Sequence, residues 1–154
     1  MKKTAPAPRI LAIASGGGHW IQLLRLRPAL AGAEVHWATV DRALGRGLDG
    51  AGFHVFNDAN RERKLALALQ ILRIAWIILR VRPEAIVSTG ASCGYLAIRI
   101  GRLLGCRTLY IDSVANAEQL SLSGRLAARH ADLMLTQWPH LASEDGPRYL
   151  GSVI

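Results

Sequence analysis

Short apolar runs rich in β-branched residues alternate along the chain with longer segments of helical periodicity. The short runs predict strands over residues 9–15, 34–40, 53–57, 85–89, 108–111 and 133–137. The helical pattern predicts helices over residues 19–30, 65–81, 93–104 and 124–130. Strands that alternate with helices form right-handed βαβ units, and these assemble into a parallel sheet covered on both faces. The pattern therefore predicts an α/β fold, in which ligands bind in the loops after the strands.

The first of these loops is rich in glycine and ends in a histidine. Gly16, Gly17 and Gly18 lie between a predicted strand and a predicted helix. Glycines let backbone N–H groups approach a ligand, and a helix N-terminus favours a phosphate. The same helix end disfavours imidazolium, so that His19 is expected to act as a neutral base. The alternative is a tight turn that serves packing only. The loop lacks the third glycine of a dinucleotide-binding fingerprint and the G-K-[ST] of a P-loop.

Two later loops bring polar residues to the same predicted edge of the sheet. Thr89 and Gly90 follow a predicted strand, and Ser92 is expected to cap the next helix. The loop over residues 112–123 contains two acids, Asp112 and Glu118, which are candidate general bases. The alternative for Asp112 is a helix cap or a salt bridge. The next predicted helix begins near Ser121, Ser123 and Gly124.

The helix predicted over residues 65–81 has an unusually wide apolar face. At 100° per residue its polar positions form one narrow stripe of Arg63, Gln70, Arg73 and Arg80. A wide apolar face with tryptophan and basic flanks is typical of a helix that lies in an anionic membrane interface. The alternative is a buried crossover helix or a subunit contact. The residues expected to contact the membrane are Leu69, Leu72, Arg73, Trp76, Leu79 and Arg80.

The composition narrows the choice of partners. The chain has 154 residues, 51% of them hydrophobic, and a formal net charge of +8 from 19 Lys and Arg against 11 Asp and Glu. We expect one domain over residues 1–154 with a flexible N-terminus over residues 1–8. The charge suits nucleic acid, a phosphorylated substrate or an anionic lipid surface. A nucleic-acid partner is not expected, because no basic stripe is interleaved with aromatic residues.

Other classes are also disfavoured by the sequence. Cys93 and Cys106 have no metal-binding spacing, so reduced core thiols and no metal site are expected. No segment reaches the roughly 20 uncharged apolar residues of a spanning helix. The N-terminal residues run into a strand without a secretory apolar region, so no leader is expected.

A set of short motifs resembles the Alg-fourteen/PssD family. They occur in order along residues 9–154, and those between residues 110 and 138 are the most specific. The motifs are SGGGH at 15–19, STG at 88–90, YIDS at 110–113, SLSGR at 121–125, AD at 131–132, QW at 137–138 and YLG at 149–151. That family supplies the acceptor-side, membrane-associated subunit of two-part glycosyltransferases. The resemblance implies a Rossmann-like sheet, the N-terminal half of a GT-B glycosyltransferase, similar to that half of MurG.

The resemblance also implies an activity and partners. A separate donor-binding subunit of the Alg-thirteen/PssE type would hold the UDP-sugar, so no cofactor is expected in this chain, which alone would be inactive. The assembled, inverting enzyme would transfer a sugar, typically N-acetylglucosamine (GlcNAc) from UDP-GlcNAc. The acceptor would be a polyprenyl-diphosphate-linked saccharide at the cytoplasmic face of the membrane. Some relatives in exopolysaccharide synthesis use glucuronic acid instead.

These implications assign roles to the residues singled out above. His19, Asp112 or Glu118 would accept the proton from the attacking hydroxyl. The acceptor and its phosphates would be bound by Gly16, Gly17, Gly18, Thr89, Gly90, Ser92, Ser121, Ser123 and Gly124. The helix over residues 65–81 would provide a peripheral attachment in place of the transmembrane anchor of eukaryotic members. The family commonly has Glu in place of Asp112 and Arg near Asn116. The alternative is a non-catalytic scaffold that recruits the donor-binding subunit to the membrane.

Overall fold

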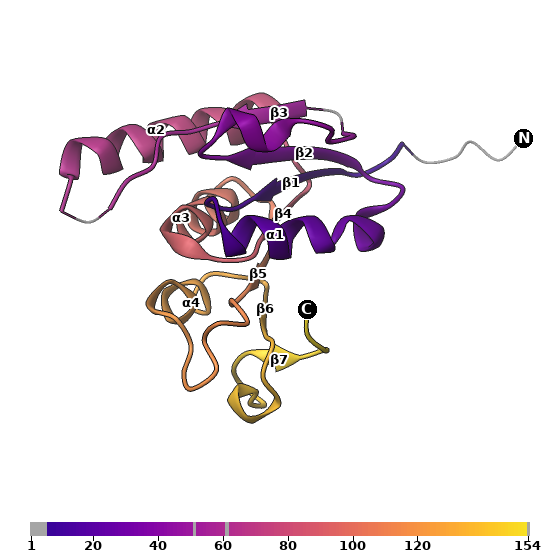
Figure 1. Cartoon of the computed structure of the whole chain (residues 1–154), viewed down its shortest axis with the longest axis vertical. Helices are drawn as coiled ribbons and strands as arrows, with labels where there is room; N and C mark the ends of the chain where they lie inside the picture. The colour runs from indigo at the N-terminus through magenta and orange to yellow at the C-terminus, as the bar shows by residue number, and fades with distance from the viewer. Residues whose placement is uncertain (1–5, 51, 61, 154) are drawn as a thin grey trace, which may run out of the picture.

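In the described part of the chain, seven strands form one sheet in which every neighbouring pair is parallel. The computed structural model describes residues 6–50, 52–60 and 62–153. The strand order is β3-β2-β1-β4-β5-β6-β7, and Figure 1 shows this stack from β3 at the top to β7 near the bottom. The strands are β1 (Arg9–Ile13), β2 (Glu34–Thr39), β3 (Gly52–Val55), β4 (Ala85–Ser88), β5 (Arg107–Ile111), β6 (Leu133–Thr136) and β7 (Arg148–Tyr149).

Helices cover both faces of the sheet, as predicted. The helix α1 (Gly18–Arg25) packs Trp20 and Leu23 on one face, against Ala12 of β1 and Trp37 of β2. The opposite face is covered by α2 (Lys64–Val81), α3 (Ala91–Leu103) and α4 (Leu122–Ala127). Short 3-10 turns are η1 (Arg27–Leu30), η2 (Arg42–Gly45) and η3 (Pro139–Leu141). Figure 1 shows α2, α3 and α4 on the left of the sheet.

The order of the strands creates a switch point beside β1. The chain runs from β1 outward to β2 and β3, and it then returns to β4 on the other side of β1. The turns after β1 and β4 therefore lead to helices on opposite faces, and a crevice forms between them. This is the point at which ligands bind in open α/β sheets.

Two local predictions are wrong, and one strand was not predicted. The first helix ends at Arg25 rather than at residue 30, because Pro28 cannot donate a backbone hydrogen bond and the chain continues as the η1 turn. Ser92 does not cap α3, which begins at Ala91 with Gly90 as its N-cap and no side-chain cap. The strand β7 was not predicted, because both of its residues are exposed and form no apolar run.

Gln70 differs in burial from the other residues of the predicted polar stripe. Its side chain is only 1% exposed, whereas Arg73 and Arg80 are exposed. Its Nε2 donates to the backbone oxygen of Asn57 at 2.9 Å, and that contact draws the amide inward. Ile74, Ile77 and Ile78 lie on the same buried side of α2.

The cysteines and the N-terminus were also the subject of predictions. Both cysteines are unbonded and buried, and desolvation raises the pKa of the Cys93 thiol to about 12. Of the N-terminus predicted to be flexible, residues 1–5 lie outside the described part of the chain. The carbonyl of Pro8 accepts a hydrogen bond from the amide of Glu34.

Candidate functional site

Two glycine-containing turns meet at the switch point. After β1, Gly17 is the N-cap of α1 and adopts φ 66° and ψ −139°, a backbone conformation that favours glycine. After β4, Thr89 and Gly90 lead into α3, and Gly90 has φ 136°. Both helices thus begin without a side-chain cap, and their first amides have no intrahelical acceptor.

His19 joins these two turns. Its Nδ1 lies 3.0 Å from the backbone oxygen of Thr89, and the Thr89 hydroxyl donates to the backbone oxygen of His19 at 2.6 Å. A Cβ atom at Gly90 would lie 2.5 Å from Cε1 of His19 and closer still to Nδ1. The imidazole ring therefore rests on the backbone of residues 89 and 90.

The contact with Thr89 also fixes the tautomer of the neutral imidazole. A backbone carbonyl can only accept, so the proton of the neutral ring is on Nδ1. The lone pair is then on Nε2. His19 consequently offers one acceptor nitrogen, held in a defined orientation, to a ligand at the switch point.

The third turn, between β5 and α4, is organised by Asp112. This carboxylate is only 2% exposed. It accepts from the amide and the hydroxyl of Ser121, at 2.8 and 2.6 Å, and from the amide of the Asn116 side chain at 3.3 Å. Gly124 packs against it, since a Cβ there would lie 3.0 Å from its Cγ atom. Asp112 therefore closes the loop and holds the start of α4.

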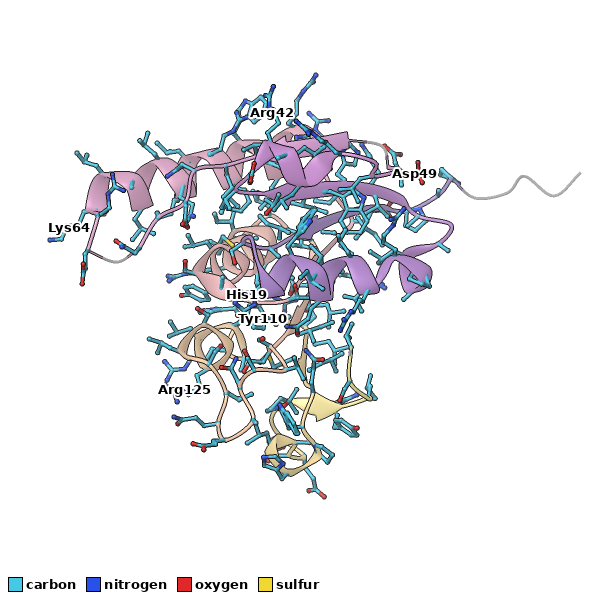
Figure 2. The ribbon with its side chains drawn as sticks, viewed as in Figure 1. His19, Arg42, Asp49, Lys64, Tyr110 and Arg125 are labelled. Carbon is cyan, nitrogen blue, oxygen red and sulfur yellow. The ribbon has the colours of Figure 1, made fainter. Side chains whose placement is uncertain are left out.

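A hollow of about 290 Å³ opens between the three turns. It is lined by His19, Ala91, Ser113, Ala115, Asn116, Ser121, Leu122 and Ser123. His19 and Ala91 stand in the first turns of α1 and α3, so the partial positive charges of these two helix ends converge on one space. Leu122 begins α4, whose first turn is already capped by Ser121. Figure 2 shows His19 near the middle of the view, where α1 begins. The hollow therefore combines two helix N-termini with the imidazole of His19.

The structure brings some of the predicted residues together and not others. His19, Ser121 and Ser123 line the hollow, while buried Thr89 and Gly90 hold His19 from behind. Gly16, Gly17 and Gly18 form the turn that starts α1, Ser92 is in the first turn of α3, and Gly124 is buried against Asp112. Glu118 is exposed and outside the lining.

Sequence reasoning missed Ala91, Ser113, Ala115, Asn116 and Leu122. Ser113 and Asn116 belong to a polar loop that the sequence does mark, but no spacing within it distinguishes residues that face the hollow. Among the described residues, no group of three or more His, Cys, Asp or Glu side chains could hold a metal ion.

A second surface, the outer face of α2, carries large exposed apolar side chains. Leu65 is 84% exposed, Leu72 is 66% and Trp76 is 49%. Leu69 and Leu79 are exposed beside them, and the Arg73 guanidinium lies 4.6 Å from the centre of the Trp76 ring. Arg73 and Arg80 are exposed as well. In the described part of the chain, none of the helices combines the length and the apolar character needed to cross a membrane.

The fold and the position of the site define a class of protein. The chain superposes on MurG of Acinetobacter baumannii with a TM-score of 0.73 and 14% identity, over 90% of this chain and 43% of MurG. This likeness confirms the predicted fold class, a Rossmann-like parallel sheet with the fold of the N-terminal half of a GT-B glycosyltransferase.

The sequence comparisons define the family. Residues 64–153 match the family described as "Oligosaccharide biosynthesis protein Alg14 like", and the chain belongs to this family. It is 29% identical to the "UDP-N-acetylglucosamine transferase subunit ALG14" of Eremothecium gossypii, over 97% of this chain and 81% of that protein. It is 25% identical to the rat (Rattus norvegicus) protein of the same name, over 94% of this chain and 82% of the relative. The predicted family is thereby confirmed.

Proposed function

We propose that this chain is the acceptor-binding subunit of a two-component glycosyltransferase. The enzyme transfers GlcNAc from UDP-GlcNAc to a polyprenyl-diphosphate-linked saccharide. The observation that carries this proposal is the hollow that is lined by His19 and lies at the N-termini of α1 and α3. The names of the curated relatives, which are UDP-GlcNAc transferase subunits, support the reaction class.

The acceptor diphosphate is the anion that this hollow would bind. Helix N-termini stabilise phosphate through free amides and the helix dipole, and no cation is required for this. A donor-binding subunit of the Alg13 type would hold UDP-GlcNAc across the hollow.

In this proposal His19 is the general base. The attacking hydroxyl of the acceptor gives its proton to Nε2, its oxygen bonds to the anomeric carbon, and the bond from that carbon to UDP breaks with inversion. The imidazolium so formed keeps its Nδ1 proton on the backbone oxygen of Thr89, which stabilises the positive charge. We assign this role to His19 because the oxygens of Asp112 already accept three hydrogen bonds and Glu118 is outside the lining. Asp112 then acts by positioning the loop.

The outer face of α2 would attach the subunit to the cytoplasmic face of an anionic membrane. Large apolar side chains that stay exposed on one helix face mark an interaction surface. The arginines on the same face favour anionic lipid, each contributing about 1 kcal/mol near the surface. The attachment would be peripheral, with the apolar side chains at the boundary between headgroups and acyl chains.

The test reconstitutes the chain with its donor-binding partner, UDP-GlcNAc and a short polyprenyl diphosphate that carries a sugar. The sharpest variant is His19→Asn, because its amide nitrogen can still donate to the backbone oxygen of Thr89 while the base is gone. We expect turnover to fall about 10²- to 10⁴-fold. Full turnover in this variant and in His19→Ala would exclude His19 as the base. If only polar substitutions on α2 abolished activity, the chain would be a scaffold. A parallel reaction with UDP-glucuronic acid tests the alternative donor.

A further inference from the structure

A buried network of hydrogen bonds, built around two side-chain amides, connects the C-terminal segment to the hollow. Val153, Gln137, Gln22 and Ser113 lie in succession along it, and the two glutamines are only 2% and 6% exposed. Gln22 belongs to α1, Gln137 follows β6, and Ser113 lies in the loop after β5. None of these residues was predicted from the sequence to belong to the site.

The donor and the acceptor of each hydrogen bond in this network follow from the backbone groups that take part. The amide of Val153 donates to Oε1 of Gln137 at 2.7 Å, while Nε2 of Gln137 donates to the backbone oxygen of Asp112 at 2.9 Å. Since an amide can only donate and a carbonyl can only accept, the orientation of the Gln137 side chain follows. The same Nε2 lies 2.6 Å from Gln22, so the Gln22 atom that faces it must be the oxygen.

This orientation turns Gln22 into a donor toward Ser113. Its Oε1 also accepts from the amide of Val114 at 3.2 Å, which again requires the oxygen there. Its Nε2 therefore donates to the Ser113 hydroxyl oxygen at 3.0 Å, and the amide of Ala115 approaches the same oxygen at 3.3 Å. Because that oxygen accepts from both, its own proton is left to donate elsewhere.

The proton of Ser113 has no acceptor among the described residues, although the residue is only 6% exposed and lines the hollow. Neighbouring Ser121 differs, because its hydroxyl donates to Asp112 and accepts from the amide of Gly124. A nearly buried hydroxyl whose proton has no acceptor costs folding free energy, unless a bound ligand accepts the hydrogen bond.

We propose that Ser113 is a ligand-binding residue whose hydroxyl donates to an anionic oxygen of the acceptor diphosphate. Gln22 and Gln137 are positioning residues that direct its proton into the hollow. This assignment rests on the proposed function, since it concerns the same ligand. The C-terminal segment also contributes to this positioning, because the amide of Val153 fixes the orientation of Gln137.

The test measures binding of a short, water-soluble isoprenyl diphosphate carrying GlcNAc to the full chain by calorimetry. Ser113→Ala should bind it about 10- to 100-fold more weakly, as expected for a hydrogen bond to a charged group. Ser113→Thr should restore most of the affinity. Ser143→Ala is the control, because it removes an exposed serine hydroxyl that lies outside the lining of the hollow. Its affinity should match the wild type.

A double-mutant cycle separates positioning from structure. In Gln22→Glu a carboxylate oxygen faces Ser113 and accepts its proton, so affinity should fall as in Ser113→Ala. Combined with Ser113→Ala it should cost nothing further. If its melting curve shows that Gln22→Glu is unfolded, Gln137→Met replaces it in the cycle.

The possible outcomes distinguish this assignment from the proposed function. Wild-type affinity in Ser113→Ala would overturn the assignment and leave the acceptor role intact. Additive losses in the double variant would overturn the role of Gln22. A wild-type chain that does not bind the diphosphate would refute the acceptor role itself, and the Ser113 contact with it.

Discussion

Gly90→Ala perturbs the contact on which the candidate site depends. Gly90 has φ 136°, and an added Cβ would lie 2.5 Å from Cε1 of His19. The backbone conformation alone costs a residue with a side chain about 1–3 kcal/mol. Forcing a methyl group into this packed contact costs about 1–3 kcal/mol more. We therefore expect the free energy of unfolding to fall by about 2–6 kcal/mol. Turnover of the assembled enzyme should fall as well, because the imidazole is displaced.

Gly105→Ala is the matched control for this prediction. Gly105 also has a positive φ, 82°, but a Cβ there would meet nothing within 4 Å. It should lose about 1–2 kcal/mol from backbone strain, with turnover unchanged. Urea unfolding of the two variants and the wild type gives the comparison, and their difference measures the collision with His19. The reasoning is refuted if Gly90→Ala is no less stable than Gly105→Ala and keeps full turnover.

Two further predictions concern α2 and the strands beneath it. Leu72→Glu replaces a side chain that is 66% exposed, so the melting temperature should stay within a few degrees of the wild type. The variant should no longer co-sediment with vesicles that contain anionic phosphatidylserine. Unchanged vesicle binding would exclude the outer face of α2 as the membrane contact. Burial, with the charges of His36, Arg73 and Arg80, lowers the pKa of His54 from 6.5. The unfolded chain then binds more protons, so the His54 contribution to stability is present above pH 6.5 and is lost as the pH falls below it. Urea unfolding at pH 7.5 and 5.5 should show a smaller loss in His54→Gln, and equal losses would contradict the assignment.

The fold was predictable to the extent that its elements have simple periodicities. Buried parallel strands are continuous apolar runs, and the described sheet contains all six that were predicted. The structure departs from simple periodicity where one contact or one proline overrides the pattern. Gln70 is drawn inward by the carbonyl of Asn57, and Pro28 converts the end of the first helix into a 3-10 turn.

The candidate site was predictable only in part, for a related reason. The glycine turns and His19 are marked by unusual local composition, so the sequence reveals them. The role of Ser113 depends instead on Gln22 and Gln137, which precede and follow it in sequence by 91 and 24 residues. No local pattern records such contacts. Asp112 was recognisable as unusual, but only its burial and its bonds to Ser121 reveal what it holds.

The parallel sheet also relates the membrane-facing helix to the hollow. Because every described strand pair is parallel, the turns after β1, β3, β4 and β5 all lie at one edge of the sheet. The hollow is at that edge, and α2 begins there at Lys64, which Figure 2 shows on the same side of the molecule as the start of α1. The first turns of α2 carry Leu65 and Leu69, both strongly exposed. Under the proposed function, a lipid carrier in the membrane contacted by α2 would therefore present its diphosphate on the side where the N-termini of α1 and α3 converge. A membrane-facing helix at the opposite edge would direct the lipid away from the hollow, so the position of α2 supports one continuous acceptor surface.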